Sequence, residues 1–249
     1  MRILLINPNI SESVSELIRS EAERSASAGT LIEVMTAPTG VAYIETRFEA
    51  LLGASATALI AAEHHERFDA VIVAAFGDPG LHALREVLPC PVTGLTEAAL
   101  ASACLLGHRF SIVAISQRIS AWYRETVDAA GLLPRLASIR ALDEPLADIG
   151  KVQDNQGDRL IRLAELCVHE DGAEVIVLAG APLAGLTRSL QGRLPVPCVD
   201  GVSSAVRHAE TLLALQPGRA RVGINAAPPH KPHKGLPPAI ARLLDRPQL

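Results

Sequence analysis

Two kinds of hydrophobic pattern alternate along the chain. Short runs of Ile, Leu and Val are separated by longer segments in which apolar residues recur every three or four positions. The short runs are typical of strands that are buried on both faces, and the longer segments are typical of amphipathic helices. The expected strands are 3–6, 31–35, 70–75, 91–94, 110–115, 136–142, 174–178 and 196–199. The expected longer helices are 13–22, 45–66, 96–106, 117–130, 157–169 and 203–215, and a short helix is expected at 238–244. Strands that alternate with helices predict an α/β protein with mainly parallel sheets.

The first of these helices has a recognisable start. Ser13 and Glu16 match the spacing of a capping box, in which the two side chains bind the first free amides of a helix. The pattern therefore predicts that the helix begins at Ser13.

One strand–turn–helix unit occurs twice. Residues 71–81 contain an apolar run, the small residue Ala75, four further residues and then Gly-Leu, and residues 175–186 repeat this order with Gly180 in the small position. Ala75 and Gly180 are 105 positions apart, and the next predicted strands, at Pro91 and Pro197, are 106 apart. A nearly constant offset predicts two similar halves. We expect one half to comprise 1–107 plus a returning segment, 216–249, and the other to comprise 108–215.

Both repeated turns follow the carboxyl end of a strand, where open parallel sheets bind their ligands. Backbone N–H groups in such turns, next to helix N-termini, suit a carboxylate or a developing oxyanion. We therefore expect the two turns to bind one small anionic or carbonyl substrate in the cleft between two pseudo-symmetric domains. The predicted substrate-binding residues are Asn7, Ala75, Phe76, Gly77, Ser116, Gly180, Ala181 and Pro182.

Composition and charge limit which partners, which location and which metal sites are expected. A net charge of -4 gives no reason to expect nucleic acid or an anionic membrane as partner. No apolar run reaches the length of a membrane span, and the N-terminus starts a strand without a signal peptide, so we expect a cytoplasmic protein. The four cysteines lack C-x-x-C spacing, and His230 and His233 have no neighbouring ligand residues, so we expect no metal.

Several segments resemble the aspartate/glutamate racemase superfamily, and within it the hydantoin and allantoin racemases. The matching segments are Ile6-Asn7-Pro8-Asn9, Ile44-Glu45-Thr46-Arg47-Phe48-Glu49, Phe76-Gly77-Asp78-Pro79-Gly80-Leu81, Gly107-His108-Arg109-Phe110-Ser111, Ala184-Gly185-Leu186 and Val199-Asp200-Gly201. The resemblance implies two pseudo-symmetric α/β domains with the site between them, and neither cofactor nor metal. It also implies a homo-oligomer, because relatives often associate.

The chain departs from this family at two positions. The resemblance implies one cysteine in each half, acting as acid and base on opposite faces of a chiral carbon, and these positions hold Ala75 and Gly180. Neither residue carries a proton. Cys198 is the nearest alternative, but it falls within a predicted strand, where a buried thiol is inert.

Other residues must therefore supply any acid–base chemistry. The candidates for catalysis are Asp78 and Glu45; Glu97 and Asp200 are further carboxylates near predicted helix starts. For Asp78 the alternative is a hydrogen bond to the turn backbone, and for Asp200 it is a helix N-cap.

Three functions remain open. The first is a hydantoin-racemase-like, cofactor-independent isomerase that acts on a small cyclic amide, amino acid or carboxylate. The second is a lyase or decarboxylase on the same scaffold, and the third is a non-catalytic protein that binds small anions.

Overall fold

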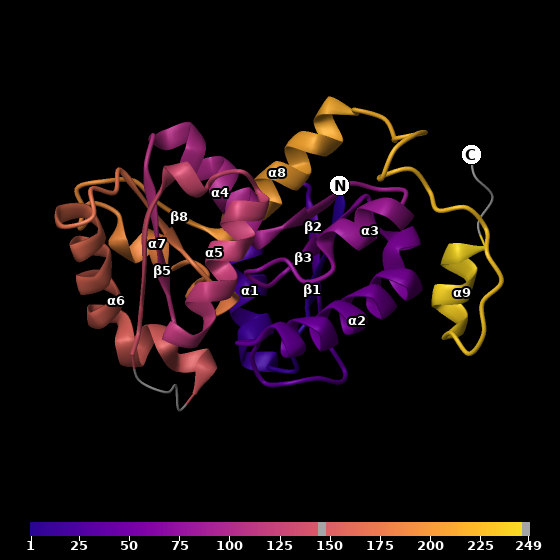
Figure 1. The fold of residues 1–249 in the computed structure, drawn as a ribbon, viewed down its shortest axis with the longest axis horizontal. Coiled ribbons are helices and arrows are strands. Elements are labelled where there is room, and N and C mark those ends of the chain that lie inside the picture. Colours follow the sequence, from indigo (N-terminus) through magenta and orange to yellow (C-terminus); the bar gives the residue numbers. More distant parts are fainter. Residues whose placement is uncertain (144–147, 246–249) are drawn as a thin grey trace.

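The chain forms two parallel four-stranded sheets flanked by helices, which confirms the predicted α/β class (Figure 1). The computed structural model describes residues 1–143 and 148–245. The first sheet has the order β2-β1-β3-β4 and contains β1 (Arg2–Asn7), β2 (Leu31–Thr36), β3 (Ala70–Val73) and β4 (Val92–Gly94). The second has the order β6-β5-β7-β8 and contains β5 (Phe110–Ala114), β6 (Leu136–Ala141), β7 (Val175–Leu178) and β8 (Cys198–Asp200).

The two sheets share one topology. In each, the first strand of the half pairs with the second and third, so the third strand lies inside the sheet beside the first. β3 pairs with β1 through Val73 opposite Ile6, and β7 pairs with β5 through Leu178 opposite Val113. β3 and β7 are buried along their whole length, as their unbroken apolar runs predict.

Helices follow most strands. They are α1 (Glu12–Ser25), α2 (Arg47–His64), α3 (Leu81–Val87), α4 (Leu95–Leu106), α5 (Ser120–Ala129), α6 (Val152–His169), α7 (Leu186–Leu190), α8 (Gly201–Leu215) and α9 (Pro238–Leu244). Short 3-10 helices are η1 (His65–Arg67), η2 (Gln117–Ile119), η3 (Leu133–Arg135), η4 (Ile149–Lys151) and η5 (Ala181–Leu183). Within the described part of the chain, no helix has the length and apolar character needed to cross a membrane.

Several helix starts differ from the sequence prediction; α6, for example, begins at Val152 and not at 157. α1 begins before Ser13, because the side chain of Ser11 accepts a hydrogen bond from the Val14 amide and acts as N-cap. A capping box lies instead at α2, where Thr46 and Glu49 bind each other's amides. As a result Glu45 lies before the helix and not within it.

The last helix of each half packs on the sheet of the other half. α8 lies against β3 and β4, α4 lies against β7 and β8, and the two helices pack on each other (Figure 1). The Thr93 hydroxyl on β4 donates to the Ala205 carbonyl oxygen on α8 at 3.3 Å. One hydrophobic cluster includes Ile72 of the first sheet and Ile176 of the second, so the halves share a core. The division 1–107 plus 216–249 and 108–215 remains a prediction, and these crossing helices join the two parts.

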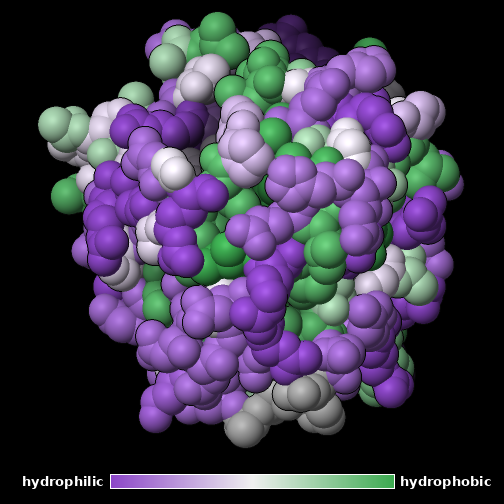
Figure 2. Space-filling view, turned by 90° about the vertical axis from the view of Figure 1, so that its left-hand side faces the viewer, coloured by the Kyte–Doolittle hydropathy of each residue, from purple (hydrophilic) through white to green (hydrophobic). Residues whose placement is uncertain are grey.

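The C-terminal segment returns to the first half. α9 packs on α2, and Ala239 and Leu243 join the cluster that contains Ile60. Figure 2 shows the side of the molecule formed by the second half, where polar residues cover most of the face and apolar residues are visible in a central strip.

Candidate active site

The repeated turns of the sequence have equivalent backbones. The first turn (residues 74–80) follows β3 and the second turn (residues 179–185) follows β7. Each ends in a left-handed glycine that precedes a short helix: Gly80 has φ 85° and Gly185 has φ 79°. Glycine is favoured at both positions because this conformation is strained for other residues. The sequence repeat therefore corresponds to a structural repeat.

The first turn packs on a helix of the second half. The Phe76 ring lies against the Tyr123 ring of α5, with centroids 4.6 Å apart. Gly77 lies under the neighbouring Trp122, and a Cβ atom on Gly77 would stand 2.3 Å from the indole ring. The first turn thus lies at the seam between the two halves.

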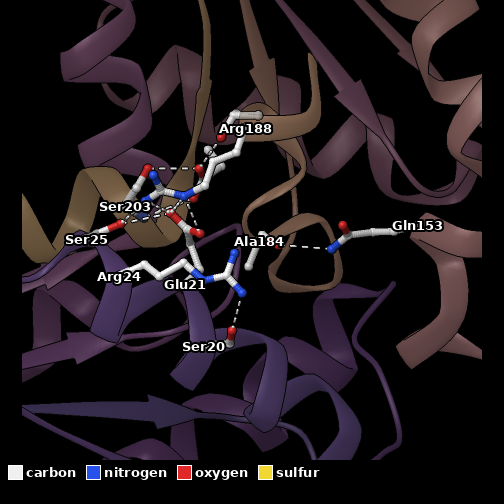
Figure 3. A network of polar contacts seen from close by, with 10 residues as sticks. Ser20, Glu21, Arg24, Ser25, Gln153, Ala184, Arg188 and Ser203 are labelled. Carbon is white, nitrogen blue, oxygen red and sulfur yellow. Dashed lines mark hydrogen bonds and ion pairs between the residues drawn. The ribbon is translucent and has the colours of Figure 1, made fainter. Parts of the chain in front are cut away.

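The second turn makes the reciprocal contact with the first half. Arg188, just after this turn, donates to the buried Glu21 of α1 through Nε and Nη2 at 2.7–3.1 Å (Figure 3). The Gln153 side-chain amide donates to the carbonyl oxygens of Pro182 and Ala184 at 2.8 and 3.0 Å, which fixes the turn from α6. Because α1 follows β1 as α5 follows β5, the two turns meet equivalent helices of opposite halves.

Backbone donors remain free at both turns. Among the described residues, the amides of Ala75, Phe76, Gly180 and Ala181 have no hydrogen-bond acceptor. By contrast, the Gly77 amide donates to the Thr96 hydroxyl at 2.5 Å. Buried amides are nearly always paired, so four free ones at the seam indicate a place for an external acceptor such as a carbonyl oxygen or an anion.

No thiol stands at these turns. Ala75 is buried, and Gly180 has φ 110°, a conformation that residues with a Cβ rarely adopt. Cys198 is the first residue of β8, within a strand as predicted, and burial followed by the charge of Asp200 raises the pKa of its thiol to about 12. A thiol in this environment is not a nucleophile or base near neutral pH.

Asp78 binds the N-terminus of α4 through its carboxylate. Its two carboxylate oxygens accept hydrogen bonds from the amides of Thr96 and Glu97 at 2.9 Å each, at the start of α4. A Cβ on Gly94 would lie 2.3 Å from the Asp78 carboxyl carbon, so only glycine leaves room for this contact. The sequence predicts a structural role for Asp78 as the alternative to catalysis, through a hydrogen bond within its own turn. The role is structural, but the predicted partner is wrong, because the Asp78 carboxylate binds amides of α4. Burial raises the pKa of Asp78 to about 7, against the lowering effect of the two amides.

Asp200 caps α8, as the sequence suggests. Its carboxylate accepts from the Ser203 amide at 2.9 Å and from the hydroxyls of Ser203 and Thr187 at 2.8 and 2.9 Å. Asp200 and Gly94 occupy equivalent strand ends. The two crossing helices therefore each receive a carboxylate: the half-buried Asp78 of the turn in the first half, and the buried Asp200 of the strand end in the second.

We expect the stability of the protein to depend on the charge of Asp78. Its folded pKa of about 7 lies above the ordinary value of 3.8, so its stabilising contribution is complete below pH 3.8 and is lost as the pH rises through 7. An Asp78→Asn variant stays neutral and tolerates the positive φ of 48° at this position. The free energy of unfolding of the wild type, relative to this variant, should fall by up to about 4 kcal/mol between pH 4 and 8. Urea unfolding across this range measures the difference, and parallel pH profiles would contradict it.

Two predicted ligand residues are used inside the fold. Asn7 is fully buried, and its side-chain amide donates to Asn9, Ser11 and Ser15 at 2.9–3.2 Å, which ties the end of β1 to α1. The Ser116 hydroxyl accepts from the Arg118 amide and caps η2. Both side chains already hydrogen-bond within the fold, and their role in binding stays a prediction.

Glu45 lies in the loop directly before α2. It is half-buried there, with Tyr43 as its hydrogen-bonding neighbour, and this contact adds to burial in raising the pKa of the Tyr43 phenol. The adjacent Arg47 pairs with Glu125 of α5, with Nε and Oε2 2.9 Å apart. The loop that carries Glu45 is therefore tied to the helix that covers the first turn.

Several residues that hold the two turns in place have no clear signal in the sequence. Trp122 is the only tryptophan of the chain, but its contact with Gly77 crosses from one half to the other. Glu21 looks like an ordinary polar position of α1, yet its side chain is 3% exposed and binds Arg188. Partners as far apart in the chain as these cannot be paired from spacing alone.

The described residues contain no group of three His, Cys, Asp or Glu side chains arranged to hold a metal ion. His230 and His233 instead pair with the same carboxylate oxygen of Asp245, at 3.3 and 3.1 Å.

Comparison with known proteins identifies the family to which this fold belongs. The profile of the Asp/Glu/Hydantoin racemase family matches residues 3–209. A hydantoin racemase from Paenarthrobacter aurescens is 38% identical over 218 residues, which are 86% of this chain and 92% of that protein. An allantoin racemase structure from Klebsiella pneumoniae superposes with a TM-score of 0.91 at 32% identity, covering 96% of this chain and 98% of the other. The allantoin racemase structure from Pseudomonas fluorescens gives a TM-score of 0.88 at 36% identity, covering 94% and 100%.

Proposed function

Because this chain belongs to the Asp/Glu/hydantoin racemase family, we propose that it is a racemase-type isomerase that acts on a small cyclic amide. Its relatives are named for hydantoin and allantoin, and the chain spans nearly their whole length. In a hydantoin the stereocentre bears a hydrogen atom next to a carbonyl group, so removal of that proton moves negative charge onto the carbonyl oxygen.

The free amides of the two turns carry the proposal. Ala75 and Phe76 on one side and Gly180 and Ala181 on the other can donate to the carbonyl oxygens of a ring held at the seam. Donors that are fixed in place before the reaction stabilise an enolate without reorganisation, and such stabilisation often contributes more to catalysis than any other effect. The proposed site binds its substrate through backbone rather than through a charged side chain.

A deuterium experiment tests the isomerase. A single enantiomer of benzylhydantoin or of allantoin is incubated with the protein in D2O, and optical rotation and deuterium at the stereocentre are followed. We expect loss of rotation together with deuterium incorporation, well above the rate without protein. An unchanged enantiomer without deuterium would contradict the proposal.

A binding protein is the second candidate, and one observation favours it. Neither Ala75 nor Gly180 has a side chain that could exchange a proton. A ligand-induced rise in melting temperature without deuterium exchange would identify this alternative. The absence of a cofactor, the cytoplasmic location and a homo-oligomeric state stay predictions from the sequence and the resemblance.

A further inference from the structure

A proton must leave and return to the substrate if the proposed isomerase function holds, and any base assigned to this chain rests on that function. The two small residues of the turns carry no titratable group. The acid–base group must therefore come from a side chain nearby.

Most carboxylates around the seam are held by fixed partners. The held groups are Glu21 by Arg188, Glu49 by the amides of its capping box, Asp78 by two amides of α4, Glu97 by Arg85, Glu125 by Arg47 and Asp200 by Ser203 and Thr187. The oxygens of these carboxylates are already engaged by amides, hydroxyls or guanidinium groups and would have to leave these donors to take a proton from the substrate. Glu45 differs from all of these, because within the described residues its side chain has neither a cation nor a backbone donor.

The position of Glu45 relative to the first turn follows from a chain of contacts. The Arg47–Glu125 pair holds the loop against α5. Tyr123, half a turn before Glu125 on the same helix, packs against Phe76 with its ring tilted. The charge of Glu45 reaches Tyr123 and contributes to the raised pKa of that phenol, after burial and Asp78. The loop of Glu45 is thus tied to the helix that packs on the first turn, and the Glu45 carboxylate has no guanidinium or amide partner among the described residues.

We propose that Glu45 removes and returns the proton at the stereocentre of the cyclic amide, and that Tyr43 positions its carboxylate. The C–H bond breaks, the proton goes to a carboxylate oxygen of Glu45, and the electron pair moves into the C=C bond of an enolate whose oxygen accepts from the turn amides. The proton then returns from Glu45 to the same carbon. Return to the original face regenerates the substrate, and return after the planar enolate turns over gives its mirror image.

A mechanism with a single base can be recognised from which enantiomer of the substrate gains deuterium. The acidic proton of Glu45 exchanges with solvent, so the enantiomer that has not inverted should also gain deuterium in D2O. Two opposed groups would place deuterium in the inverted enantiomer alone. Chiral separation followed by mass spectrometry of benzylhydantoin distinguishes the two, and deuterium confined to the inverted enantiomer would overturn the single-base assignment.

Variants of the pair test the residues themselves. Glu45→Gln should slow deuterium exchange about 100-fold or more, the size expected when a general base is lost. Tyr43→Phe keeps the ring, which packs against the shared core, and should lower kcat about 10-fold with the Kd for benzylhydantoin unchanged, because it loses only the hydroxyl. Glu23→Gln is the matched control, since Glu23 is exposed on α1, and should exchange at the wild-type rate.

The outcomes separate the two proposals. If wild type and Glu45→Gln exchange equally fast, the assignment of Glu45 is overturned and the isomerase proposal stands. If Tyr43→Phe weakens binding and leaves kcat unchanged, Tyr43 contacts the substrate and does not position Glu45. If the wild type binds benzylhydantoin without any exchange, the isomerase proposal fails together with the role of Glu45.

Discussion

Gly77→Ala should be among the most damaging single substitutions in the first turn. Gly77 has φ 96°, and a Cβ would lie 2.3 and 2.4 Å from two atoms of the Trp122 ring. The backbone strain and the displaced indole each cost about 1–3 kcal/mol, so we expect the free energy of unfolding to fall by about 2–6 kcal/mol. Urea unfolding measures the loss.

A matched glycine separates strain from the clash. Gly29 has φ 85° and no atom within 4 Å of an added Cβ, so Gly29→Ala should lose only about 1–2 kcal/mol. Trp122→Ala in the Gly77→Ala background should recover part of the loss, because it removes the clashing ring. Equal effects of Gly77→Ala and Gly29→Ala would show that the indole does not pack on the turn as described.

Cysteine should be tolerated at Ala75 and not at Gly180. Ala75 has no positive φ, whereas Gly180 has φ 110° and ψ 142°, which favours glycine. Gly180→Cys should therefore cost about 1–3 kcal/mol of stability through backbone strain, since its nearest neighbour, Pro182, is in ordinary contact at 3.5 Å. Ala75→Cys should keep the wild-type backbone, and its thiolate would be stabilised by the free turn amides and react readily with iodoacetamide.

The two cysteine variants are compared by thermal unfolding and by alkylation rate. Equal stability of both would mean that the second turn relaxes freely. It would also mean that the second turn of this chain is not built around glycine.

The strands and the two turns could be predicted because their determinants are local. Buried parallel strands such as β3 appear as unbroken apolar runs, and left-handed positions such as Gly80 and Gly185 require glycine. The repeat offset then follows from the sequence alone. The resemblance to the racemase family is confirmed by the comparisons.

What escaped prediction depends on contacts between distant segments. Asp78 has the spacing of a turn residue, but its acceptor atoms serve amides 18 and 19 residues later, because α4 crosses to the second sheet and starts beside the turn. Asn7 has the chemistry of a ligand residue, yet α1 folds back and uses its amide. The lack of a cation or amide partner at Glu45 emerges only after the partners of the other carboxylates are known.

The central claim is that the free amides of both turns bind one ring. Titration of the ¹⁵N-labelled protein with benzylhydantoin, followed by amide chemical shifts, tests it most directly. We predict that the amides of Ala75, Phe76, Gly180 and Ala181 shift most and saturate with a single Kd. Saturable shifts at only one turn, or at residues away from both, would contradict it.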